Sequence, residues 1–485
     1  MRRLIRVLLV LGTALLLLAV PGPAPVVPPA PTGGAPFRWN RDAYWTELEA
    51  RFLAARSNGC DQVGLTVRLA VQTLRQQLTR LAADQPAPDA PALDSLESGM
   101  FDLAPMIAAC PDGLVEYVGL QGELRNVVKE LSGRWDVTTR PARERLYRLL
   151  YGSRLAVEEL ILHHPGVVPA LLPGRPEPSA TPATEIAGVR VHSGDILVSR
   201  GGYPTSALIA RGSDYPGDFS HVALVHVDES TGEAVAIEAL IERGVVITPA
   251  ASYLRDKKLR IMVLRPRADL PALVADPLLP HRAASRALER ARSERIRYDF
   301  AMDYQDPSRQ FCSEVASAAY QPEGITLWTG LSTISTPGLR RWLAGFGVRF
   351  FETQEPSDLE YDPQLVVVAE WRDEAALRDD HIDNAVIDAL LEGAEAGDEL
   401  STPWRQLVVV RLAKGWSRLA DLVGSRGPVP EGMSAAPAVR NRGFTERQRR
   451  IASEVRQAAD RLTAEQGYPP PYWTLVELAR ASRYP

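Results

Sequence analysis

The chain has 485 residues, of which 45% are hydrophobic and 24% are charged, the composition of a globular protein of about two to four domains. Its formal net charge is −5 at pH 7, and its Arg residues are interspersed with Asp and Glu. A nucleic-acid-binding protein needs clustered Lys and Arg to contact phosphates, so this charge pattern argues against that class and we expect no nucleic-acid partner.

The first twenty residues have the pattern of an export signal. A basic start over residues 1–6 precedes an apolar run of 14 residues from Val7 to Val20. That length matches the core of a signal peptide and is short of the ~20 residues that span a bilayer. Including Leu4 and Ile5 gives a marginal span, so an uncleaved membrane anchor is the alternative. In both cases we expect the protein to be exported to the periplasm or the extracellular space.

Composition then separates a tether, a helical part and a linker. Residues 21–36 are rich in Pro, Gly and Ala, which is typical of an extended tether. Residues 37–164 predict a bundle of about four or five helices, since apolar residues recur every three or four positions. The clearest stripe is Val63, Val67, Val71, Leu74, Leu78 and Leu81. Residues 165–185 are proline-rich and predict a linker. The bundle is expected to serve packing or docking, with an unknown protein partner.

The chain contains three cysteines, and two of them have positions that predict a disulfide. Cys60 precedes a helix predicted over 61–82, and Cys110 ends the next helix, predicted over 93–109. If these helices pack antiparallel, both cysteines lie at the same pole of the bundle and can pair. Two buried free thiols are the alternative. The disulfide would leave Cys312 as the only free thiol.

Residues 186–371 predict an α+β domain with a mostly antiparallel sheet, flanked by N- and C-terminal helical domains. Short runs rich in Val and Ile alternate with turn residues and predict strands over 195–198, 221–227, 234–238, 244–247, 259–264 and 365–369. Helices are predicted over 280–293 and 312–320. Residues 372–485 return to a helical pattern, with helices predicted over 373–391, 404–423, 445–464 and 472–481, and a flexible insertion over 424–437. Thr445 and Gln448 resemble a capping box.

Three residues of the central domain could form a catalytic triad. Cys312 is expected to begin a helix, where backbone N–H groups would lower the pKa of its thiol. His221 begins a predicted strand and could serve as a base for that thiol. Glu238 lies in an apolar strand, where a charge is costly unless it is paired, and it could orient the imidazole. The alternatives are an inert buried thiol, a structural histidine and an exposed glutamate on an edge strand.

These residues occur in an ordered set of short motifs. The motifs are Gly194-Asp195-Ile196-Leu197, Ser220-His221-Val222, Ile237-Glu238-Ala239, Tyr298-Asp299-Phe300 and Phe311-Cys312-Ser313-Glu314. Their order resembles the circularly permuted NlpC-like branch of papain-fold hydrolases, especially the YiiX-like amidases. The resemblance implies that Cys312 is the nucleophile, His221 the general base and Glu238 the orienting residue, with Tyr298 and Asp299 near the pocket. The segment 206–217 is long for this pattern and is expected to form a lid or a helix.

The function expected from these features is an exported thiol-dependent hydrolase or acyltransferase that forms an acyl-enzyme at Cys312. The expected substrates are cell-wall peptide amides or lipid-linked acyl groups. The alternatives are a degenerate papain-like module that binds a cell-envelope ligand, and an interaction protein that acts through its helical domains. We expect no cofactor and no metal site, since the sequence has no Cys-x-x-Cys, His-Glu-x-x-His or Gly-rich phosphate motif. In the enzyme, the Cys312 sulfur should lie within ~4 Å of a His221 ring nitrogen.

Overall fold

The computed structural model describes residues 13, 17–20, 22, 25–38, 41–422, 427–430 and 432–483. The predicted signal or anchor segment over 1–20 therefore lies mostly outside the described residues, as does part of the predicted insertion over 424–437. Among the helices in these ranges, none is long and apolar enough to cross a membrane.

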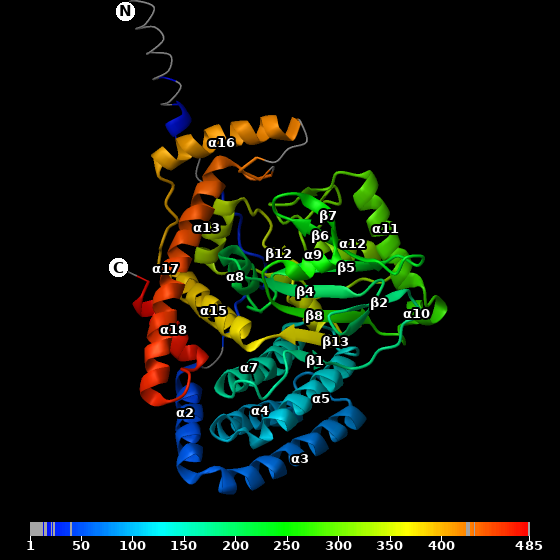
Figure 1. Ribbon diagram of the computed structural model, residues 1–485, viewed down its shortest axis with the longest axis vertical. Helices are drawn as coiled ribbons and strands as arrows, with labels where there is room; N and C mark the ends of the chain where they lie inside the picture. The colour runs from blue at the N-terminus through cyan, green and yellow to red at the C-terminus, as the bar shows by residue number, and fades with distance from the viewer. Residues whose placement is uncertain are drawn as a thin grey trace, which may run out of the picture.

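A seven-stranded sheet occupies the centre of the molecule (Figure 1). Neighbouring strands are all antiparallel, which confirms the predicted α+β class. In spatial order the strands are β1 (Leu171–Pro173), β13 (Leu365–Arg372), β8 (Lys258–Pro266), β4 (Ile196–Gly201), β5 (His221–Val227), β6 (Ala234–Leu240) and β7 (Gly244–Pro249).

Both faces of this sheet are covered, which explains why its strands are nearly continuous apolar runs. On β5, Val222 and Leu224 join one core, whereas Ala223 and Val225 join another on the opposite face. The first face packs against α5 (Leu114–Ser132), α7 (Ser153–His163), α11 (Leu279–Ser293) and α12 (Glu314–Tyr320). The second face packs against the hairpin of β2 (Ala183–Ile186) and β3 (Val189–His192) and against α9 (Ala250–Arg255).

The N-terminal helices form the predicted bundle at one end of the molecule (Figure 1). They are α2 (Arg41–Asn58), α3 (Cys60–Asp84), α4 (Pro91–Ala109), α5, α6 (Arg140–Leu146) and α7. All six side chains of the predicted stripe on α3 are buried. The bundle shares one continuous core with the sheet. The segment 165–185, expected as a linker, contributes β1, which pairs with β13 through Leu171 and Trp371. Backbone pairing therefore integrates this segment into the sheet.

The C-terminal helices build a second core together with α8 (Pro204–Arg211) and α13 (Pro337–Phe346). They are α15 (Glu374–Glu395), α17 (Ala435–Gln466) and α18 (Tyr472–Ala481), whereas α16 (Trp404–Leu422) packs against α17 outside this core. The prediction that a helix starts at Thr445 is wrong. Val439 and Phe444 are both buried, so tertiary packing extends α17 by ten residues toward the N-terminus. Part of the predicted insertion is therefore helical.

Shorter elements connect these layers. They are the helices α10 (Pro271–Ala275) and α14 (Asp358–Tyr361), the parallel pair β9 (Arg297–Tyr298) and β10 (Arg309–Gln310), and the antiparallel pair β11 (Ser332–Thr333) and β12 (Glu352–Thr353). The pair β9–β10 lies directly before the predicted nucleophile, and it positions the loop that leads to α12.

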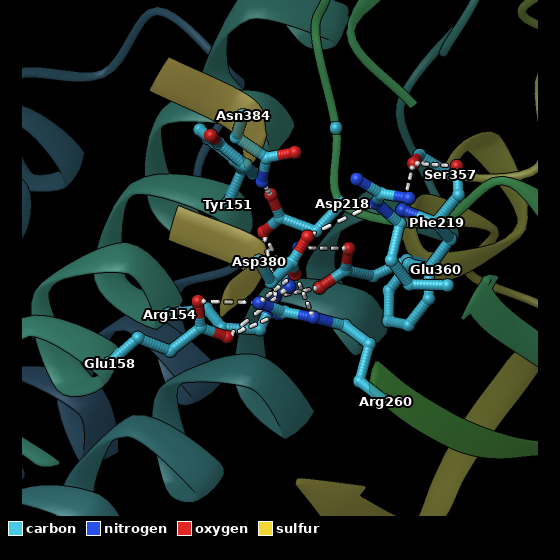
Figure 2. A network of polar contacts seen from close by, with 12 residues as sticks. Tyr151, Arg154, Glu158, Asp218, Phe219, Arg260, Ser357, Glu360, Asp380 and Asn384 are labelled. Carbon is cyan, nitrogen blue, oxygen red and sulfur yellow. Dashed lines mark hydrogen bonds and ion pairs between the residues drawn. The ribbon is translucent and has the colours of Figure 1, made fainter. Parts of the chain in front are cut away.

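A buried network of ion pairs joins the bundle, the sheet and the C-terminal helices (Figure 2). Arg154 of α7 contacts both carboxylate oxygens of Glu360, at 2.9 and 2.8 Å, and one oxygen of Asp218 at 2.8 Å. Arg260 of β8 contacts Glu158 at 2.5 Å and Asp380 of α15 at 2.6 Å. Asp218 precedes β5 by three residues, so the network also holds the segment that leads to His221.

The predicted disulfide is confirmed. Cys60 and Cys110 are bonded, with Cα atoms 5.3 Å apart, because α3 and α4 pack against each other and bring the start of one beside the end of the other. Cys312 is the free cysteine of the described residues, and it is buried. The antiparallel arrangement proposed from the short connection between these helices therefore holds.

Reduction of this disulfide should destabilise the protein without releasing a thiol from the active site. The bond closes a loop with a sequence separation of 50, and the chain-entropy relation gives a stabilisation of about 4 kcal/mol for such a loop. Thiol titration of the denatured protein should find one free thiol before reduction and three after it. Three thiols before reduction would contradict the disulfide. A Cys60→Ala/Cys110→Ala double variant should show the same loss of unfolding free energy as the reduced protein.

Candidate active site

His221 and Glu238 are brought together by the register of two neighbouring strands. Ala223 of β5 faces Glu238 of β6, and His221 lies two residues before Ala223, on the same face of the sheet. The distance from His221 Nε2 to Glu238 Oε2 is 2.6 Å. The exposed-edge interpretation of Glu238 is wrong, because β7 covers β6 and the carboxylate is buried.

The contact with Glu238 determines which ring nitrogen of His221 can act as a base. A carboxylate accepts hydrogen bonds, so Nε2 carries the hydrogen and Nδ1 carries the free lone pair. Burial would raise the pKa of Glu238, but the hydrogen bond and charge of His221 and a hydrogen bond from Thr248 lower this pKa overall. Glu238 is therefore a buried carboxylate that holds the orientation of the imidazole through this hydrogen bond.

Cys312 lies just before α12, near the first residue of β5, which is His221. Val315 and Ala316 anchor α12 in the core beneath the sheet, and this packing fixes the position of the preceding thiol. The Cys312 sulfur is 3.7 Å from the carbonyl oxygen of Ser220, the residue adjacent to His221. Across the described residues, no hydrogen bond joins this thiol to the His221 ring.

The pKa of Cys312 differs from the expectation for a residue at a helix start. Burial raises it to about 12, although the backbone N–H of Val222 and the hydroxyl and backbone N–H of Ser313 act in the opposite direction. The expected lowering is wrong for this conformation, because the loss of water around the sulfur outweighs these local donors. Cys312 is therefore a neutral thiol at neutral pH.

Two groups that the sequence motifs left out surround the candidate triad. The Tyr253 hydroxyl of α9 donates a hydrogen bond to Ser199 at 2.9 Å, and its ring lies 6.3 Å from the His221 ring, centroid to centroid. The Glu355 carboxyl is buried, which together with the charge of Asp358 raises its pKa well above the usual range. A charge on Glu355 would in turn raise the pKa of the Cys312 thiol.

The two residues expected to shape the pocket have different roles. Tyr298 of β9 is half-buried, and the loss of water around its hydroxyl, together with the neighbouring Cys312 sulfur, raises its pKa well above its ordinary value. Asp299 accepts the backbone N–H groups of Ala301 and Asp303, so it stabilises the loop rather than offering a free carboxylate. Tyr298 is thus the closer of the two to the thiol chemistry.

The segment 206–217 is a fixed helix and turn. Its first half belongs to α8, whose Ala207 and Leu208 are buried against the C-terminal helices. Arg211 at the end of α8 forms a two-point ion pair with Asp388 of α15, at 2.9 and 3.0 Å. Of the two structures expected for this segment, the helix is confirmed, and its anchoring by α15 argues against a mobile lid.

Several residues that surround the candidate triad could not be predicted from sequence patterns. Tyr253, Ser199 and Glu355 come from three separate elements and belong to none of the five motifs. Glu355 lies between β12 and α14, and no periodic pattern in the sequence there predicts that it is buried. Only the tertiary structure identifies these groups as neighbours of the triad candidates.

The central domain has the architecture and residue types of a papain-like thiol hydrolase. Residues 190–368 match the family model described as permuted papain-like amidase enzyme, YaeF/YiiX, C92 family. This match confirms the resemblance inferred from the motifs for that part of the chain. No curated protein matches the chain.

One solved structure is similar to part of this chain. It is titled as the crystal structure of metalloprotein yiiX from Escherichia coli O157:H7, DUF1105. The identity is 21%, the TM-score is 0.29, and the similarity covers 37% of this chain and 97% of that chain. Within the residues described for the present protein, no group of three or more His, Cys, Asp or Glu side chains is placed to hold a metal ion.

Glu238→Gln should change the pH dependence of stability. The folded-state pKa of Glu238 is below its ordinary value of 4.5, so its ionisation stabilises the fold above that pH. This contribution is lost as the pH falls through the lowered folded-state pKa. The difference in unfolding free energy between wild type and variant should be constant above about pH 5.5 and shrink below about pH 4.5. Urea unfolding at a series of pH values measures it; a difference that does not change with pH contradicts the ionised pair.

Proposed function

We propose that this protein is an exported cysteine hydrolase, or acyltransferase, that cleaves an amide or ester through an acyl-enzyme at Cys312. The observation that supports this best is the His221–Glu238 pair at 2.6 Å, which lies one residue from the carbonyl that the Cys312 thiol contacts. The match of residues 190–368 to an amidase family supports the same chemistry.

In the proposed mechanism, the thiol is deprotonated only as it attacks. The raised pKa of Cys312 means that a thiolate is not present beforehand, so Nδ1 of His221 must take the proton during attack on the carbonyl carbon. Substrate binding would turn the sulfur from the Ser220 carbonyl toward this nitrogen. The imidazolium then protonates the leaving amine or alcohol, and Glu238 balances its charge. Water, or a second acceptor, releases the acyl group from Cys312.

Backbone donors near the sulfur could stabilise the tetrahedral intermediate. The N–H groups of Val222 and Ser313 both lower the pKa of Cys312, so they lie within reach of negative charge at this position. A well-placed donor of this kind typically contributes about 3 kcal/mol to transition-state stabilisation. The oxyanion of the substrate would be held here and at the N–H of Cys312 itself.

The proposed substrates are cell-wall peptide amides or lipid-linked acyl groups, met in the periplasm or outside the cell. The signal-like segment over 1–20 supports export, and the Cys60–Cys110 disulfide supports an oxidising compartment. An uncleaved segment would also hold the protein at a membrane.

A second candidate is a degenerate papain-like module that binds a cell-envelope ligand. The observation that favours it is the state of Cys312, which is only 4% exposed and has a raised pKa. A structural thiol has these same properties.

Trapping of the acyl group separates the two candidates. The protein would be mixed with a set of activated amides, esters and thioesters, quenched in acid and measured by intact-protein mass spectrometry. The enzyme should gain the mass of one acyl group, located on Cys312 by peptide mapping, and Cys312→Ala should gain none. A Cys60→Ala/Cys110→Ala variant, which keeps Cys312, is the matched control and should still be acylated. Absence of acylation across the set favours the binding module.

A further inference from the structure

The helix α16 has its apolar side turned away from the protein. Its exposed large apolar residues are Trp404, Val409, Leu412, Trp416 and Leu419, which are between 58% and 64% exposed. Residues 409, 412, 416 and 419 are separated by three or four positions and therefore form one face of the helix. We call Val409, Leu412, Trp416 and Leu419 the apolar face of α16.

The other side of α16 is fixed to the molecule. Leu407 and Ala420 are buried, and Ser417 accepts the backbone N–H of Val429 at 3.1 Å. Lys414 donates to the carbonyl oxygen of Pro430 at 2.6 Å. An ordinary surface helix buries its apolar stripe and exposes its polar side, so α16 is inverted relative to that pattern. In the part of the chain that the structure describes, no residue buries its apolar face.

Position and charge both indicate what covers this face. Arg411 of α16 donates to the backbone carbonyls of Leu17 and Leu18, so the end of the apolar segment 7–20 lies against this helix (Figure 1). Arg405 and Arg418 are exposed on α16, and the Arg405 guanidinium lies 5.4 Å from the centre of the Trp404 ring. Trp side chains, neighbouring Arg and an outward apolar stripe are the features of a helix that lies in a membrane interface.

We propose that the apolar face of α16 inserts into the surface of an anionic lipid bilayer, beside the N-terminal segment. The helix would lie parallel to the membrane, with Trp416 and Leu412 among the acyl chains and the Arg side chains at the headgroups. Two attachments at neighbouring points would hold the protein in one orientation, whereas a single anchor would let it rotate freely. This proposal does not depend on thiol chemistry at Cys312.

A reporter on the apolar face tests this proposal in the full chain. Trp416→Cys in a Cys312→Ala background would be labelled with an environment-sensitive fluorophore, with the Cys60–Cys110 disulfide kept intact. The control is Leu69→Cys, an apolar residue that is 56% exposed on α3, at the opposite end of the molecule from α16 (Figure 1). Both proteins carry the same N-terminal segment, so that segment contributes equally to both measurements.

On adding vesicles of phosphatidylglycerol and phosphatidylcholine, emission at position 416 should rise roughly twofold or more, and emission at position 69 should not change. Adding Leu412→Glu and Leu419→Glu to the Trp416→Cys protein should abolish the rise. Equal signals at both positions, or none, would overturn the proposal. A rise without vesicles that grows with protein concentration would also overturn it, because it would indicate a second copy of the chain on this face.

Discussion

Replacing Cys312 with alanine is expected to reduce turnover by about 10³-fold or more, whichever acyl substrate the enzyme accepts. The reason is that no other described thiol is free to form the acyl-enzyme, since Cys60 and Cys110 are bonded to each other. The His221→Ala variant should lose nearly as much turnover, because the neutral thiol depends on Nδ1 of His221 to remove its proton. The Glu238→Gln variant should lose less turnover, because the imidazole remains and only its orientation and the balance of its charge are weakened.

The double variant Cys312→Ala/His221→Ala should be no slower than Cys312→Ala alone, because residues that act as a unit are not additive. Steady-state kinetics on a substrate found by acyl trapping gives these numbers, and thermal unfolding of each variant checks that the fold is kept. The Cys60→Ala/Cys110→Ala protein, assayed below its unfolding temperature, should retain turnover. Undiminished activity in Cys312→Ala would refute the mechanism and leave the papain-like fold unaffected.

Arg154→Met is expected to lower the free energy of unfolding by about 3–5 kcal/mol. Arg154 is 1% exposed and faces the carboxylates of Glu158, Asp218 and Glu360, so its loss leaves buried negative charge without a partner. The matched control is Arg75→Met, which removes an ion pair with Glu123 whose partners are 43% and 47% exposed. Solvent screens that pair, so its loss should cost about 1 kcal/mol or less.

Urea unfolding of both variants measures the difference. Arg154→Lys keeps the charge but not the two-point contact with Glu360. Its free energy of unfolding should therefore lie between those of the wild type and Arg154→Met. If Arg154→Met does not fold, this conservative variant still tests the prediction. The Arg154→Met/Glu360→Gln protein should lose less free energy of unfolding than the sum of the two single variants, because one of the unpaired carboxylates has been neutralised. A loss as small as that of Arg75→Met would show that water reaches the network.

Local patterns determined much of the fold. The strand predicted over 221–227 coincides with β5, and the apolar stripe on α3 is the buried face of that helix. Both follow from side-chain periodicity, which depends on the nearest neighbours in the chain. The predicted helix start at Thr445 was wrong, because the burial of Val439, and of Phe444 in the second core, outweighed the local capping pattern.

The candidate site shows the same division. The ordered motifs indicated Cys312, His221 and Glu238, and the spacing of Cys60 and Cys110 between two helices predicted their disulfide. Only the tertiary structure decided that Nε2 of His221 meets Glu238, because strand register sets that contact. The tertiary structure also decided that the Cys312 thiol is neutral, because its burial depends on every element packed around α12. In the same way, folding brought Arg154, Arg260 and Asp380 together from distant parts of the chain. Residue type and spacing are properties of the sequence, whereas desolvation and long-range charge pairing arise only when the chain is folded.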